Sequence, residues 1–126
     1  MRRSVLAGAL CALVLPATAQ AKVRWFHSPS GNIQCEVAAN DPRGTYAYCQ
    51  TFSPLASVKL NRAGHSRVCH GGTCVGNGPE NAFTLGYGKS VTVGPFRCTS
   101  RPSGMTCVVA SSGHGFRIAR GGITKL

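Results

Sequence analysis

Acidic side chains are scarce in this sequence. Its 126 residues include 14 Lys and Arg but only three Asp and Glu. The three acidic residues are Glu36, Asp41 and Glu80. A catalytic pair of His and Glu therefore has few candidates, and no spacing ties a histidine to a carboxylate. The excess of positive charge favours anionic partners, although the same charge can serve only to keep an exported protein soluble.

An apolar run long enough to span a membrane is also lacking. The longest run, residues 5–15, is far shorter than the ~18 to 20 residues that cross a bilayer. It follows Arg2 and Arg3 and precedes small residues that end in Ala19-Gln20-Ala21. This order is typical of a secretory signal peptide with an Ala-x-Ala cleavage site. We therefore expect residues 1–21 to be a cleaved signal peptide and residues 22–126 to be a single secreted or periplasmic domain without a membrane anchor.

A domain this small buries a limited core, and its cysteines offer covalent support. Of the seven cysteines, Cys11 lies in the expected signal peptide and six remain. An even number of cysteines in an exported chain indicates disulfide bonds formed in an oxidising compartment. The sequence leaves their pairing open, but sequential pairing places each bond within one expected hairpin. The favoured pairs are therefore Cys35 with Cys49, Cys69 with Cys74, and Cys98 with Cys107.

No window after residue 21 has the apolar spacing of a helix. Short alternating runs, separated by Gly, Pro, Asn and Ser, are present instead. The expected strands cover residues 23–27, 33–38, 45–52, 56–60, 83–87, 90–93, 96–100, 105–110 and 116–119. Many short strands at regular spacing are typical of an antiparallel all-β domain. We expect a small β-sandwich or a barrel-like domain, with a helix only in the signal peptide.

The usual motifs of catalysis and cofactor binding are missing. No serine lies in a Gly-x-Ser-x-Gly motif, and Gly88-Lys89-Ser90 lacks the earlier glycine of a phosphate-binding loop. A cluster of possible metal ligands consists of His65, Cys69, His70 and Cys74. Zinc sites need a second ligand pair, which the chain does not offer once its other cysteines are bridged. We therefore expect a Cys69–Cys74 disulfide loop in place of a metal site, and no cofactor.

Basic residues are the best candidates for a binding surface. Without Arg2 and Arg3, 12 basic residues remain against three acidic ones, a net charge of +9. Such a charge favours anionic glycans, lipids or protein surfaces, and leaves nucleic acid open. His114 lies in the most distinctive string, Gly113-His114-Gly115-Phe116, although a turn histidine bonded to its own loop is the simpler interpretation. The candidate binding residues are Arg24, Arg97, Arg101, His114, Arg117 and Arg120.

The aromatic residues allow two interpretations. The set consists of Trp25, Phe26, Tyr46, Tyr48 and Tyr87. They form either an aromatic binding face beside Arg24, Arg43 and Arg97, or part of the core with tyrosine hydroxyls at its rim. In so small a domain we expect most of them in the core.

Five strings of residues resemble one family. They are residues 26–35 (FHSPSGNIQC), 85–88 (LGYG), 96–100 (FRCTS), 104–107 (GMTC) and 113–116 (GHGF). In this order they resemble an uncharacterised bacterial family of small exported proteins with the pattern SPSGNIxC, LxYG, FxCxS, GxxC and GHGF. The resemblance spans nearly the whole mature chain but is loose over residues 62–75. Members of that family are recorded as proteins of unknown function, so the resemblance implies a topology but no activity and no catalytic residue.

Together these observations favour binding over catalysis. We expect a non-catalytic module that binds an anionic partner in the cell envelope or outside the cell. One alternative is a small secreted nuclease or phosphodiesterase in which His27 or His114 moves protons. Another is an inhibitor of a cell-wall-degrading enzyme of the lysozyme type, whose own positive charge would oppose association.

Overall fold

The computed structural model describes residues 7–14 and 20–126. Residues 7–14 are exposed and contain neither helix nor strand, so the expected signal helix is not seen there. Residues 1–6 and 15–19 of the expected signal peptide lie outside the described residues. In the part of the chain that is described, no helix has the length and apolar character needed to cross a membrane.

From residue 22 to the C terminus, eleven strands form two sheets. The six-stranded sheet has the order β5-β4-β3-β2-β1-β6, with β1 (Lys22–His27), β2 (Ile33–Asp41), β3 (Gly44–Phe52), β4 (Leu55–Asn61), β5 (Ser66–His70) and β6 (Phe83–Thr84). The five-stranded sheet has the order β11-β10-β9-β8-β7, with β7 (Ser90–Val93), β8 (Phe96–Arg101), β9 (Gly104–Val109), β10 (Gly115–Ala119) and β11 (Gly122–Lys125). A short 3₁₀ helix, η1 (Gly72–Cys74), follows β5.

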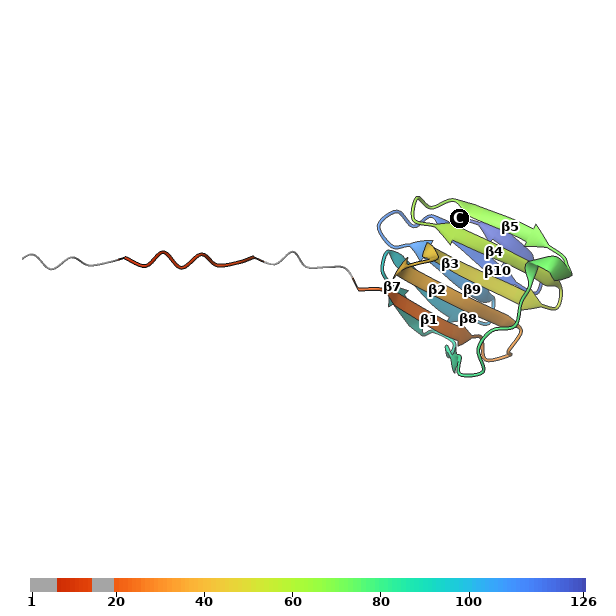
Figure 1. Ribbon diagram of the computed structural model, residues 1–126. Coiled ribbons are helices and arrows are strands. Elements are labelled where there is room, and N and C mark those ends of the chain that lie inside the picture. Colours follow the sequence, from red (N-terminus) through yellow and green to blue (C-terminus); the bar gives the residue numbers. More distant parts are fainter. Residues whose placement is uncertain (1–6, 15–19) are drawn as a thin grey trace, which may run out of the picture.

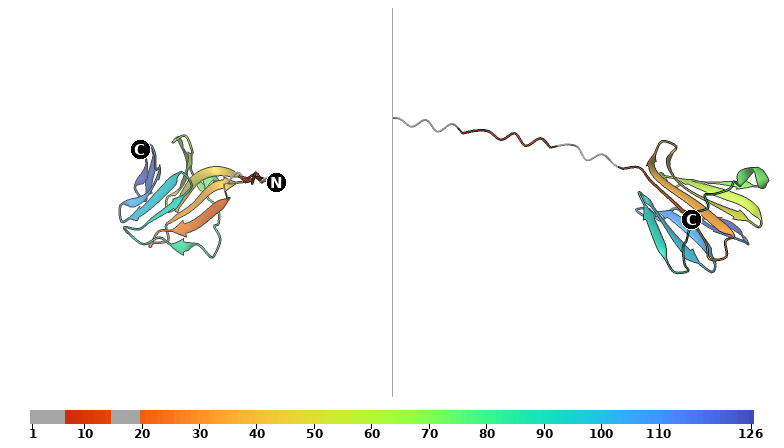
Figure 2. Two further views of the ribbon diagram at one scale, coloured as in Figure 1. Left: turned by 90° about the vertical axis from the view of Figure 1, so that its left-hand side faces the viewer. Right: turned by 60° about the horizontal axis from the view of Figure 1, so that its bottom comes forward.

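The two sheets pack face to face (Figure 1), and turned views show them as two layers (Figure 2). Neighbouring strands are antiparallel except β6, which pairs with β1 in parallel. The expected all-β fold is therefore confirmed. Of the two expected forms the sandwich is right, and the barrel-like form is wrong because the described strands belong to two separate sheets.

Alternation of side chains along the strands builds the core. In β8, Phe96, Cys98 and Ser100 are buried, whereas the residues between them face outward. The same alternation buries Phe116 and Ile118 in β10. Because successive side chains of a strand point to opposite faces, each sheet contributes one apolar face to the layer between them.

The structure pairs the cysteines in the sequential order favoured above. The disulfides join Cys35 to Cys49, Cys69 to Cys74, and Cys98 to Cys107. The first and third bonds each link directly opposite residues of neighbouring strands, β2 with β3 and β8 with β9. Both of these bonds are buried, and together they form part of the core between the sheets.

Two expectations about strands are wrong. The strand expected over residues 83–87 ends after Thr84, and a turn follows it. The structure also has two strands that we did not expect, β5 and β11. Each of the two is the outermost strand of its sheet, next to β4 or β10.

Candidate functional site

The outer face of the six-stranded sheet carries a row of aromatic and charged side chains. Residues directly opposite one another on neighbouring strands share one face of the sheet. The row runs from Trp25 on β1 through Glu36 on β2, Tyr48 on β3 and Lys59 on β4 to Arg67 on β5. With neighbouring strands ~4.8 Å apart, it is about 19 Å long. The row can therefore contact several units of an extended polymer.

Glu36 is the acidic centre of this face. It is only 8% exposed, and its Oε1 accepts a hydrogen bond of 2.6 Å from the hydroxyl of Tyr46. The guanidinium of Arg43 lies 2.8 Å from the same oxygen. Burial and the hydrogen bond to Glu36 raise the pKa of Tyr46 to about 12, so this hydroxyl stays protonated and remains a donor.

Arg43 also binds the second carboxylate of this region. Its Nε donates to Oδ1 of Asp41 over 2.9 Å, and its backbone N–H donates to the same atom. These two hydrogen bonds, the backbone one foremost, lower the pKa of Asp41. One arginine in the β2–β3 turn thus pairs with both Glu36 and Asp41.

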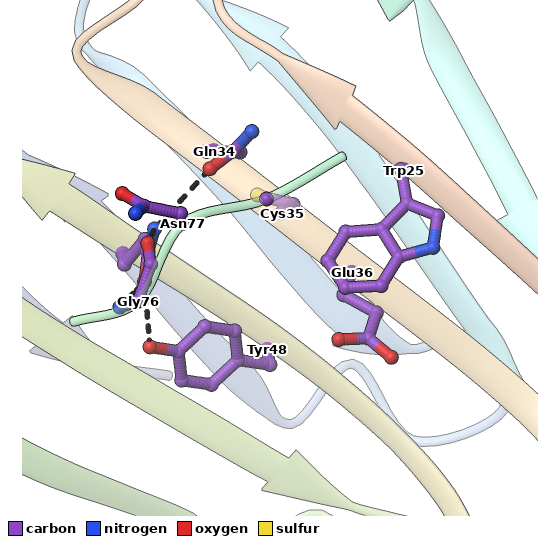
Figure 3. Close-up of a pocket in the computed structure, with 9 residues that line it drawn as sticks. Trp25, Gln34, Cys35, Glu36, Tyr48, Gly76 and Asn77 are labelled. Carbon is purple, nitrogen blue, oxygen red and sulfur yellow. Dashed lines mark hydrogen bonds between the residues drawn. The ribbon is translucent and has the colours of Figure 1, made fainter. Parts of the chain in front are cut away.

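A strap of residues 75–78 crosses the outer face (Figure 3). Gln50 and Tyr48 hold it by hydrogen bonds. Gln50 Nε2 donates to the carbonyl oxygen of Gly76 over 2.6 Å, and Gln50 Oε1 accepts from the Gly76 N–H over 3.0 Å. The hydroxyl of Tyr48 lies 2.7 Å from the carbonyl oxygen of Cys74. A Cβ on Gly78 would lie 2.5 Å from Cδ of Gln34, so a larger residue at this position would require the Gln34 side chain to move.

The strap, β1, β2 and β3 enclose a small polar and aromatic hollow, which we name the Trp25 pocket. Its volume is about 130 Å³. It is lined by Trp25, Gln34, Cys35, Glu36, Tyr48, Gln50, Gly76, Asn77 and Gly78. In Figure 3 the carboxylate of Glu36 lies between the rings of Trp25 and Tyr48, and Asn77 lies on the strap. The pocket thus combines two aromatic rings, one carboxylate and three side-chain amides.

Beside this pocket lies an open hollow of about 660 Å³ with basic walls, which we name the cationic groove. Its charged and aromatic lining consists of Arg43, Tyr46, Lys59, His65, Arg67 and Lys125. Lys59 Nζ lies 4.3 Å from the centre of the Tyr46 ring, a cation–π contact. Tyr48 of the Trp25 pocket is directly opposite Lys59 of the groove, so the two hollows adjoin at this pair. From there the groove extends to Lys125 on β11 of the other sheet.

Most of the basic residues have no acidic partner. Both ion pairs within the described ranges involve Arg43. From Lys22 onward, the other Lys and Arg residues, including Lys59, Arg67 and Lys125, form no ion pair with any described residue. The cationic groove therefore presents uncompensated positive charge.

Comparison with known proteins places the chain in a family. Residues 55–124 match a family of unknown function, DUF6636, over more than half of the chain. The chain belongs to DUF6636. No curated protein and no solved structure matches it. The DUF6636 match begins at β4 and ends in β11, so it includes Lys59 and Arg67 but not Trp25, Glu36 or Tyr48.

The structure distributes the candidate binding residues of the sequence over several places. Arg97 and Arg117 lie on the outer face of the five-stranded sheet, inside the residues matched by DUF6636. Arg101 and Arg120 line a hollow of about 210 Å³ together with Ser28 and Ser30 of the first family string. Arg24 lies on β1 of the six-stranded sheet, and its guanidinium is 5.2 Å from the centre of the Phe83 ring on β6. Arg97, Arg101 and Arg117 thus share one face of the five-stranded sheet, because Arg101 alternates with Arg97 along β8, whereas Arg24 lies on the other sheet.

The histidines that could serve in catalysis do not meet a carboxylate. His27 is bonded through Nδ1 to the carbonyl oxygen of Ser28 and through Nε2 to Thr84. His114 is exposed, and its backbone, not its ring, bonds to the loop at Ser112 and Val109. Among the described residues, a histidine–carboxylate ion pair is thus not seen.

The aromatic interpretation is partly right. Trp25, Tyr46 and Tyr48 share the outer face with Arg43, whereas Phe26 is in the core. Only Phe26 and Tyr46 are buried, while Trp25 and Tyr48 are half-buried and Tyr87 is exposed, so the expectation that most of the five lie in the core is wrong. Gln50, Lys59 and Arg67 were not among the residues expected from the sequence. The spacing of Tyr46, Tyr48 and Gln50 by two residues was the available signal, because it places all three on one face of a strand.

Proposed function

We propose that this chain is an exported, non-catalytic module that binds an anionic polymer through the cationic groove. The observation that carries the proposal is the distribution of ion pairs. Arg43 takes both nearby carboxylates, while Lys59, Arg67 and Lys125 line the same groove without an acidic partner among the described residues. Positive charges gathered in one hollow repel one another, and a polyanion relieves that repulsion.

The placement of these charges argues for a binding role beyond solubility. Charge that only keeps a protein soluble has no need to gather in a concave surface. Here Lys59, Arg67 and Lys125 come from strands of two different sheets and line one groove, in which Lys59 Nζ lies 4.3 Å from the centre of the Tyr46 ring. An aromatic wall beside cations adds contact area and direction to an electrostatic attraction.

Export is the second part of the proposal. Three disulfides support it, because such bonds persist in the periplasm or outside the cell and are rare in the reducing cytoplasm. The signal-like order of residues 1–21 supports it independently.

The test is binding of fluorescein-labelled dextran sulfate, measured by fluorescence anisotropy with protein exported from the full-length sequence. We expect binding at low salt that is lost at high salt, because the contacts are exposed charges. The double variant Lys59→Gln/Arg67→Gln is expected to bind about tenfold more weakly, since each cation near an anionic surface is worth about 1 kcal/mol or less.

The matched control is Arg97→Gln/Arg117→Gln, which removes the same charge from the outer face of the other sheet. It is expected to bind within about twofold of the unaltered protein. If the control loses as much affinity as the groove variant, the groove is not the site. Absence of binding at low salt would overturn the proposal as a whole.

A further inference from the structure

We infer that the Trp25 pocket is a saccharide subsite, and that the anionic polymer is therefore an acidic polysaccharide. This inference rests on the proposed function of the cationic groove and gives its ligand a chemical class. The pocket would hold the ring of one sugar unit, while the groove would pair with acidic substituents of neighbouring units.

The aromatic walls of the pocket suit the apolar face of a sugar ring. Trp25 is half-buried and stands at one side of the pocket, and the ring of Tyr48 stands at the other (Figure 3). The C–H groups on one face of a pyranose pack against an aromatic ring as other apolar groups do. Their slightly positive hydrogens face the electron-rich face of the ring. Such packing positions a ring without needing a charged group on it.

The polar groups of the pocket suit hydroxyls. Four of them have no hydrogen-bond partner within residues 7–14 and 20–126: the indole N–H of Trp25, Nε2 of Gln34, Oε2 of Glu36 and the amide of Asn77. They are a mixture of donors and acceptors. A sugar hydroxyl both donates and accepts, so a set of vicinal hydroxyls can use both kinds.

These groups are held in place before any ligand arrives. Gln50 fixes the strap at Gly76, and the same amide donates to Oε1 of Gln34 over 3.2 Å. Tyr46 and Arg43 both hold Oε1 of Glu36, which leaves the other carboxylate oxygen for a ligand. A pre-organised site loses little conformational entropy when it binds, which favours useful affinity from a small contact.

The size of the pocket and its neighbour define what the ligand must be. A hollow of about 130 Å³ that is open on one side takes one ring edge and not a whole polymer. The next residue along the row after Tyr48 is Lys59, directly opposite it on β4, and Arg67 follows on β5. A chain lying along this row thus places a sugar at Trp25 and its next units at two cations.

A ligand with a quaternary ammonium group is the main competitor, because aromatic rings around a carboxylate also attract cations. Two observations favour the sugar. The carboxylate of Glu36 is already paired with Arg43, and the adjoining groove carries unpaired positive charge that repels a cation. The amides of Gln34 and Asn77 also have no role toward an ammonium group without hydrogen-bond donors or acceptors.

The experiment uses the fluorescence of Trp25, which is the only tryptophan of the chain and therefore reports on this pocket alone. The exported, oxidised protein is titrated with polygalacturonate, with polyglutamate as a polyanion without sugar, and with choline. We expect polygalacturonate to shift or quench the emission of Trp25. Polyglutamate is expected to bind the groove, as measured by anisotropy of the labelled polymer, with little change in Trp25 emission.

Variants test the same point by affinity. Asn77→Ala, which removes a side chain with no described partner, is expected to weaken polygalacturonate binding about threefold, and Trp25→Ala about tenfold. Neither is expected to change polyglutamate binding. The controls are Asn81→Ala and Tyr87→Ala. Asn81 lies in the same loop as Asn77 but outside the pocket, and Tyr87 is an aromatic residue, 49% exposed, that does not line the pocket.

The outcomes separate the two proposals. If Asn77→Ala and Trp25→Ala bind polygalacturonate as the unaltered protein does, or if polyglutamate changes Trp25 emission equally, the saccharide subsite is wrong while the cationic groove stands. A response of Trp25 to choline and none to polygalacturonate also overturns the subsite. If neither polymer binds, the proposed function itself is wrong.

Discussion

The sulfur atoms of Cys49 and Cys107 lie 3.7 Å apart, although the two residues belong to different sheets. Cys49 is bonded to Cys35 across β2 and β3, and Cys107 to Cys98 across β8 and β9. Two disulfides therefore meet in the middle of the sandwich. Each bond holds the register of its own hairpin, and the contact between them relates one sheet to the other. Sulfurs already committed to disulfides have no thiolate to offer a metal ion.

This contact predicts a new cross-link between the sheets. In the double variant Cys35→Ala/Cys98→Ala, Cys49 and Cys107 are left as thiols. Their sulfurs are 3.7 Å apart, about two ångströms more than the length of a disulfide bond. We expect mild oxidation with diamide to join them, because diamide takes up the two thiol protons and two electrons as the S–S bond forms. Peptide mapping by mass spectrometry should find the Cys49 and Cys107 peptides linked.

Oxidation of the same variant in concentrated urea is the control, because an unfolded chain no longer holds these two residues together. The linked peptides should then be a minor product. If Cys49 and Cys107 remain separate thiols after oxidation of the folded variant, the two sheets do not pack as described.

Two of the three disulfides, Cys98–Cys107 and Cys69–Cys74, are expected to differ in their effect on stability. Cys98→Ala/Cys107→Ala removes a cross-link and two buried sulfurs from the core, and should lower the free energy of unfolding by about 4 kcal/mol. Cys69→Ala/Cys74→Ala opens a short loop with an exposed Cys69, and should cost about 2 kcal/mol or less. Urea titrations of the two double variants measure the difference, and equal losses would contradict it.

The sequence predicted the central strands and the disulfides well because both depend on neighbours along the chain. Cys98 and Cys107 lie on consecutive strands joined by a tight turn, so the hairpin itself brings them opposite each other. The same holds for Cys35 and Cys49. In these strands one face is buried, so the alternation of apolar residues is clear.

The edge strands were missed for a physical reason. β5 and β11 each pair on one side only, and Val68 and Ile123 are the residues of these strands that pack against the core. A single partly buried residue produces no alternation that a sequence can show. Charged or small residues on such strands, as in Arg67 and Gly122, are common because they discourage pairing with other chains.

The candidate site could be predicted only in part. Tyr46, Tyr48 and Gln50 share one face of one strand, which their spacing already indicates. That Lys59 and Arg67 continue the row depends on the register of β3, β4 and β5, which residue spacing alone does not give. The strap reaches Gln50 from 26 residues further along the chain, through hydrogen bonds that no local pattern signals.

Gln50 is predicted to be the anchor of the strap. Gln50→Ala removes its hydrogen bonds to Gly76 and Gln34 and should lower the free energy of unfolding by about 2 kcal/mol. Hydrogen exchange of the Gly76 amide should become faster, because its acceptor is gone. Gln34→Ala, which loses a single weaker bond, is the control and should leave Gly76 protected. Unchanged protection in Gln50→Ala would show that another contact holds the strap.

Tyr46 is predicted to make the stability of the domain fall at high pH. Burial and Glu36 raise the pKa of its hydroxyl to about 12 in the native state, against an ordinary value of 10.0. Because the neutral hydroxyl is favoured in the folded chain, its contribution to stability is complete below about pH 10 and is lost as the pH rises towards 12. Urea titrations at a series of pH values should show the free energy of unfolding falling over this window.

Other groups also titrate between pH 10 and 12, so the variant Tyr46→Phe isolates this one. At neutral pH it should be less stable by about 2 kcal/mol, because it lacks the hydrogen bond to the Glu36 carboxylate. Since the bond is already missing, the further loss of stability between pH 10 and 12 should be smaller than in the unaltered protein. Tyr87→Phe, at an exposed tyrosine away from Glu36, should keep the full dependence. A Tyr46→Phe curve parallel to that of the unaltered protein would mean that Tyr46 and Glu36 are not coupled, and that Arg43 alone holds the carboxylate at the centre of the site.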